Sequence, residues 1–106
     1  MSVAPLRRMS RTSMARLLED IEPGTPVLLG IERIGEVRGV YAEGSARLAE
    51  YIAIWWASRS AVLLVPTKDV ASLDETGVTL MGDDARTYAE IPTFDEARYP
   101  TIRKIK

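Results

Sequence analysis

The sequence contains no cysteine and no histidine. Without cysteine the chain has neither disulfides nor thiol nucleophiles, and without both residues it lacks the usual side-chain ligands of transition metals. Histidine is also the only side chain that titrates near neutral pH without perturbation. A chain without cysteine suits a reducing compartment, and we therefore expect a cytoplasmic location.

Long hydrophobic runs and common catalytic motifs are absent as well. The longest apolar run near the middle, residues 51–57, is far too short to span a bilayer. The arginine pair near the start is not followed by the apolar run of a secretory signal. No GxxxxGK[ST], GxGxxG, GxSxG or HExxH pattern occurs. We therefore predict a protein without a transmembrane segment, without a cofactor and without enzymatic activity.

The composition is that of one small globular domain, but its charges are unevenly placed. Of the 106 residues, 46% are apolar and 27% are charged, and the net charge is −1. All 15 acidic residues lie in residues 17–102, and basic residues dominate both ends. The favoured interpretation is that both ends are solvated termini. The alternative is a pair of basic arms for an acidic partner, such as RNA or an anionic surface.

The N-terminal end supplies the candidate arm. Residues 1–13 read as a flexible basic arm, in which Arg7, Arg8 and Arg11 are the candidate contact residues. Met9 and Met14 offer alternative translation starts to Met1. Residues 14–84 read as the folded domain, beginning with a short helix over residues 14–21 that Ser13 can cap.

Turn residues divide the rest of that domain into short strands. We expect strands over residues 26–30, 35–42, 47–57, 61–65 and 78–81, with a shorter element near Val70. Gly35 and Gly39 lie inside the second strand, where glycine often marks a bulge or bend. The predicted class is therefore all-β, a small and strongly bent antiparallel barrel of about six strands.

The strand over residues 47–57 carries the candidate interaction surface. Because side chains alternate between faces, Ile52, Ile54 and Trp56 are expected to form the core. On the other face, Tyr51 and Trp55 are separated by alanine and form a shallow trough, which we expect to be covered. Residues 85–106 read as an extended C-terminal extension over the barrel, with a short helical turn near residues 95–98.

Three covers for this trough stay open at this stage. The C-terminal extension can place Ile91, Pro92 and Phe94 over it, and a second copy of the chain can cover it in a homodimer. A foreign ligand or partner can also stack there. Packing is favoured over ligand binding, because aromatic residues at strand spacing more often pack.

The remaining polar candidates are weaker. Thr67, Lys68 and Asp69 place a hydroxyl, an amine and a carboxylate after Pro66, but such residues more often shape the corner by bonding the backbone. Asp83 and Asp84 do not supply the six or more oxygens of a calcium site.

Several of these segments together resemble the PRC-barrel family. The resemblance rests on residues 30–41 with their G-x-V pattern, residues 50–56, residues 62–66 with the Val-Pro corner, and residues 78–80. It covers roughly residues 24–82. The family implies a six-stranded barrel used for assembly, and it supplies no catalytic residue to transfer.

We therefore predict a prokaryotic, PRC-barrel-like adaptor or assembly module that binds a protein partner or itself. Its candidate contact residues are Tyr51, Trp55, Arg7, Arg8 and Arg11. The alternatives are a small ligand-binding or carboxylate-dependent enzyme barrel using Asp69, Asp83 or Asp84, and an RNA-associated factor using the basic ends.

Overall fold

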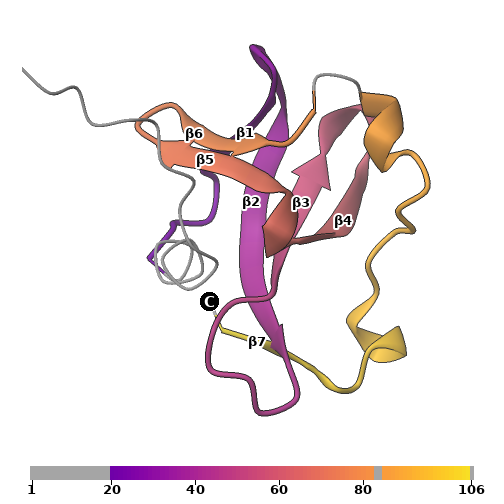
Figure 1. The fold of residues 1–106 in the computed structure, drawn as a ribbon. Coiled ribbons are helices and arrows are strands. Elements are labelled where there is room, and N and C mark those ends of the chain that lie inside the picture. Colours follow the sequence, from indigo (N-terminus) through magenta and orange to yellow (C-terminus); the bar gives the residue numbers. More distant parts are fainter. Residues whose placement is uncertain (1–19, 83–84, 106) are drawn as a thin grey trace, which may run out of the picture.

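The computed structural model describes residues 20–82 and 85–105, which form one bent β-sheet with short 3₁₀ turns (Figure 1). The strands are β1 (Pro26–Leu29), β2 (Glu32–Glu43), β3 (Tyr51–Trp56), β4 (Ala61–Pro66), β5 (Val70–Asp74), β6 (Gly77–Leu80) and β7 (Ile102–Lys104). The 3₁₀ helices are η1 (Ala57–Arg59), η2 (Thr67–Asp69), η3 (Ala85–Tyr88) and η4 (Glu96–Arg98). The all-β class is therefore confirmed. None of the helices in these ranges is long and apolar enough to cross a membrane.

The sheet has the strand order β4-β3-β2-β1-β6-β5, and β7 adds to β2. Its strands curve around one apolar interior (Figure 1). Within the described ranges no pairing joins β4 to β5, so the sheet is open and a closed barrel stays a prediction. The expectation of a wholly antiparallel sheet is wrong in one place, because β1 and β6 run parallel. The chain between them supplies the long connection that a parallel pair requires.

Two bulges bend β2, each beside a glycine that the sequence singles out. The register of β2 shifts against β1 next to Gly35, and it shifts against β3 between Val37 and Gly39. At Gly35, β2 and β3 also approach closely, since a Cβ atom there would lie 1.7 Å from the carbonyl oxygen of Trp55. Glycine is therefore required at this position by the distance between β2 and β3.

Two strands differ in length from their predicted bounds by more than one residue. β2 is longer, because Glu32 and Arg33 pair with β1 across the hairpin. β3 begins at Tyr51 instead of residue 47, since the preceding residues form the β2–β3 loop. In this loop the carboxylate of Glu50 accepts a hydrogen bond from the backbone N–H of Glu43 at 2.9 Å.

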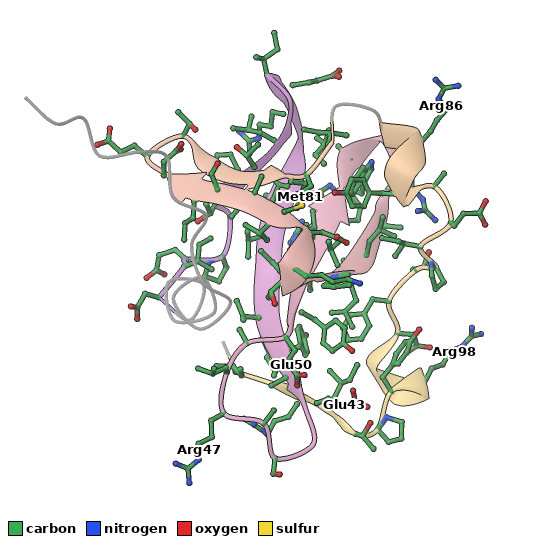
Figure 2. The ribbon with its side chains drawn as sticks, viewed as in Figure 1. Glu43, Arg47, Glu50, Met81, Arg86 and Arg98 are labelled. Carbon is green, nitrogen blue, oxygen red and sulfur yellow. The ribbon has the colours of Figure 1, made fainter. Side chains whose placement is uncertain are left out.

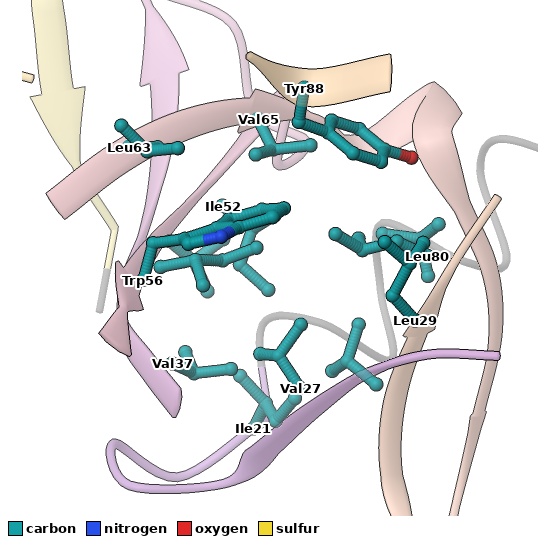
Figure 3. Close-up of a cluster of buried hydrophobic side chains, with 14 of the residues drawn as sticks. Ile21, Val27, Leu29, Val37, Ile52, Trp56, Leu63, Val65, Leu80 and Tyr88 are labelled. Carbon is teal, nitrogen blue, oxygen red and sulfur yellow. The ribbon is translucent and has the colours of Figure 1, made fainter. Parts of the chain in front are cut away.

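The interior is apolar, and its largest member is Trp56 (Figure 3). Trp56 is 2% exposed, as the alternation along β3 predicts. Its ring lies 5.5 Å from the ring of Tyr88, whose hydroxyl donates a hydrogen bond to the Met81 carbonyl at 2.6 Å. Among the described residues no polar or charged side chain is classed as buried. The core is therefore apolar throughout the described residues, and the ring pair of Trp56 and Tyr88 is part of it.

The chain after Tyr88 crosses the outside of the sheet, and residues 91–105 are here called the C-terminal strap. Thr93 bridges to Leu63, and the Phe94 N–H donates to the Val62 carbonyl at 2.8 Å. The strap then makes the η4 turn, close to the predicted position, and ends in β7. The expectation of an extended segment from residue 85 is wrong at η3, because burying Tyr88 against Trp56 requires a turn there.

Some predicted features lie outside the described residues. They are the arm of residues 1–13, with Arg7, Arg8 and Arg11, most of the helix predicted for residues 14–21, and the pair Asp83 and Asp84. Ile21 is described, and its side chain joins the apolar core.

Candidate interaction surface

The outer face of β2, β3 and β4 carries the predicted contact residues. Register pairs Trp55 with Glu36 on β2 and with Val62 on β4, and it pairs Tyr51 with Tyr41 and Pro66. Residues paired across neighbouring strands share a face of the sheet. Tyr51 and Trp55 therefore lie on one face, opposite the core face of Ile52, Ile54 and Trp56.

Aromatic side chains gather around this outer face. The sequence has seven aromatic residues, and only Trp56 and Tyr88 belong to the apolar core cluster. Phe94 lies edge-on to Tyr41, with ring centroids 5.1 Å apart, and 5.6 Å from Tyr99. The C-terminal strap therefore adds the rings of Phe94 and Tyr99 to the aromatic side chains that β2 and β3 place on this face.

Phe94 divides the predicted trough into two hollows. It lines one hollow together with Tyr51, and it lines another together with Ala53 and Trp55. Ala53, which lies between the two aromatic residues on β3, is only 1% exposed. The C-terminal strap therefore occupies the middle of the trough, and Tyr51 and Trp55 lie in separate surroundings.

Two cationic side chains line the Trp55 hollow. The Arg38 guanidinium lies over the indole ring of Trp55, 5.4 Å from its centroid, and Lys104 of β7 lines the same hollow. Arg38 also pairs with Glu36 at 3.4 Å. An arginine at this distance over a tryptophan face is in the range of a cation–π contact. Trp55 remains half-buried and so presents an aromatic surface beside two cationic side chains.

The Tyr51 hollow carries negative charge. It has a volume of about 290 Å³, and its lining residues are Glu43, Tyr51, Leu64, Ile91, Pro92, Phe94, Tyr99, Thr101 and Ile102. Burial raises the pKa of Tyr51, and the nearby charges of Glu43 and Glu50 raise it further. Figure 2 shows both glutamates at the same end of the sheet. The two hollows on this face therefore have opposite electrostatic character.

A third hollow lies at the end of the interior, beside Asp69. Its lining includes Lys68, Asp69, Met81 and Tyr88. Burial raises the pKa of Tyr88, and the charge of Asp69 adds to that effect. The Thr67 hydroxyl donates a hydrogen bond to the Ala49 carbonyl at 3.4 Å, so this corner residue bonds the backbone as a donor to a carbonyl.

The described part of the chain brings no three Asp or Glu side chains together as metal ligands. Of the carboxylates named for the rival enzyme, only Asp69 is described, and its backbone carbonyl accepts a hydrogen bond from the Met81 N–H at 2.7 Å.

The basic C-terminal end is partly built into the sheet. Arg103 donates hydrogen bonds from its guanidinium to the carbonyls of Gly44 and Ala46, and Lys104 lines the Trp55 hollow. Sequence reasoning gave no role to Arg38 and considered Lys104 only as part of the basic C-terminal end. Arg38 lies at the bulge between Val37 and Gly39, and its contact with Trp55 is made across strands, so no local pattern in the sequence points to it.

No family model, curated protein or solved structure matches this chain.

Proposed function

We propose that the protein is a non-enzymatic adaptor or assembly module of the PRC-barrel type, and that it binds a protein partner through the Trp55 hollow. The observation that carries the proposal is the half-buried Trp55 with Arg38 over its ring and Lys104 beside it. Aromatic and arginine side chains dominate the binding energy of protein interfaces. The PRC-barrel part of the proposal rests on the sequence resemblance, whose segments lie largely in strands, including β4, which ends at Pro66.

A protein partner is favoured over RNA by charge. Residues 17–102 contain all 15 acidic residues of the chain, which repel a polyanion over distances longer than a single contact. Arg38, which also pairs with Glu36, and Lys104 form a small cationic area at the Trp55 hollow. Such an area suits one acidic side chain next to an apolar one, because the apolar group can pack on Trp55 and Val62.

The test is affinity purification from the native cell with the tagged chain and three variants. Trp55→Ala is expected to lose the partner, and Arg38→Gln to reduce its recovery. Arg47→Gln makes the same charge change on an exposed loop residue outside the hollow and serves as the matched control. Equal recovery by all variants would contradict the Trp55 surface, and recovery that ribonuclease abolishes would point to RNA instead.

The protein partner can also be a second copy of this chain. If the Trp55 hollow joins two copies, sedimentation of the full chain gives a dimer and Trp55→Ala gives a monomer. A hetero-partner gives a monomer in both cases. The two results therefore assign the Trp55 hollow to self-assembly or to an adaptor role.

A further inference from the structure

We infer that the Tyr51 hollow is a binding site for a quaternary ammonium group, formed by the aromatic rings of Tyr51, Phe94 and Tyr99 together with the carboxylate of Glu43. This inference goes beyond the proposed contact at Trp55 and stands without it. All four residues line one hollow of about 290 Å³. Ring faces and a carboxylate are the groups that attract a cation with a large apolar surface.

The walls come from two parts of the chain that the fold brings together. Tyr51 belongs to β3, and Glu43 ends β2, while Phe94 and Tyr99 belong to the C-terminal strap. The strap is held near this place by the Phe94 N–H bond to Val62 and by β7, which pairs with β2 at Glu43. The site is therefore positioned by backbone hydrogen bonds on both sides.

The electrostatic surroundings favour a positive guest. Glu50 lies beside Glu43, since its carboxylate accepts the Glu43 N–H at 2.9 Å. The charges of both glutamates act on the phenol of Tyr51 and favour its neutral form. The same negative potential stabilises a cation in the hollow.

The apolar lining selects the kind of cation. A primary ammonium has three N–H donors that need acceptors, whereas a quaternary ammonium has none. The side-chain acceptors of this hollow are Glu43, Thr101 and the hydroxyls of Tyr51 and Tyr99, whereas Leu64, Ile91, Pro92 and Ile102 form an apolar part of the lining that supplies none. An ammonium with methyl groups packs against these side chains without leaving a donor unpaired.

The experiment compares choline with its neutral carbon isostere, 3,3-dimethyl-1-butanol, by titrating the full chain in an NMR tube. The two ligands have nearly the same shape and differ in charge. We expect choline to shift the ring signals of Tyr51, Phe94 and Tyr99 and to bind about tenfold more tightly or better. Equal affinity for the two ligands, or no binding of choline, would overturn the inference.

Variants locate the binding at these residues. Tyr99→Leu keeps apolar volume but removes a ring, and Glu43→Gln removes the charge. Each is expected to weaken choline binding by about two- to fivefold. Glu75→Gln, in the β5–β6 turn, makes the same charge change elsewhere and should leave the affinity unchanged. If Glu75→Gln weakens binding as much as Glu43→Gln, the general acidity of the body explains it, and the site is refuted.

A last pair of titrations identifies whether the ammonium group belongs to a protein partner or to a small molecule. A short peptide containing trimethyllysine is titrated beside the same peptide with unmodified lysine. Binding of the trimethylated peptide that exceeds choline binding places the group on a protein partner. Choline binding that equals or exceeds it places the group on a small molecule. Preference for the unmodified lysine peptide would contradict the apolar selection argued above.

Discussion

Trp55 and Trp56 are neighbours in the chain but have opposite surroundings, because successive side chains of a strand point to opposite faces. Trp56 is 2% exposed and packs against Tyr88, while Trp55 is half-buried under Arg38. We predict that Trp56→Ala lowers the free energy of unfolding by about 3–5 kcal/mol, since it leaves a large cavity. Chemical denaturation measures this loss, which is a large part of a typical total of about 5–15 kcal/mol.

Trp55→Ala is the matched control, because it removes the same side chain from the outer face. We expect it to cost roughly 1 kcal/mol, the ordinary loss for a substitution that creates no internal cavity. Equal losses for the two variants would mean that the phase of β3 is wrong.

Gly35 gives a second prediction at the scale of single residues. Alanine at this position places its Cβ atom 1.7 Å from the Trp55 carbonyl oxygen, so β2 and β3 must move apart. We expect Gly35→Ala to cost about 3 kcal/mol, the upper part of the range for overpacking. Gly30→Ala is the control, since nothing lies within 4 Å of its Cβ position and only the positive φ of 63° opposes it. It should cost about 1–2 kcal/mol in the same denaturation experiment, and a Gly35 loss no larger than this would contradict the close approach.

At the scale of elements, the local patterns predict the strands well and the long-range contacts poorly. The alternation in β3 and the glycines of β2 are local signals, and the structure has the buried face of β3 and the bulges of β2 where these signals predict them. The two hollows depend on Phe94, which reaches Val62 and Tyr41 from a segment without periodicity. The sequence offered Phe94 as one of three covers of the trough, but the division into two hollows and the burial of Tyr88 are set by tertiary packing and could not be read from spacing.

Removing the C-terminal strap is predicted to change the self-association of the protein. A chain ending at residue 90 lacks Phe94 and β7 and exposes Tyr51, Ala53 and Trp55 together. We expect this chain to sediment as a dimer or larger species, because a contiguous apolar patch favours association. The full chain is the reference. A shortened chain that stays soluble and monomeric would show that the strap is not needed to cover this face.

A second shortened chain, ending at residue 84, tests the core role of Tyr88. Both shortened chains lack the strap, so their difference isolates residues 85–90. We expect the shorter one to be less stable by about 3–5 kcal/mol, the loss typical of removing a buried aromatic side chain. Thermal and chemical unfolding of the two chains measure the difference. Equal stability would contradict the packing of Tyr88 on Trp56.

At the scale of the whole molecule, the chain combines an acidic middle with basic ends. The structure describes Arg103 and Lys104 of the C-terminal end but none of the arginines of the N-terminal end. Arg103 and Lys104 belong to the sheet through β7, and Lys104 lines the Trp55 hollow. Arg7, Arg8 and Arg11 lie outside the described residues and stay a prediction. The Trp55 hollow therefore already has cationic side chains without the arm.

This arrangement leads to a prediction for the arm. We expect the triple variant Arg7→Ser, Arg8→Ser, Arg11→Ser to bind the purified partner as tightly as the unchanged protein at low salt. Exposed ion pairs contribute about 0–1 kcal/mol each, so the melting temperature should also stay nearly unchanged. If the arm binds a polyanion instead, affinity falls steeply with salt, because screening shortens the field to about 8 Å near physiological ionic strength. A salt dependence that the triple variant abolishes would then assign the arm to binding, and Arg38→Gln would leave most of that dependence in place.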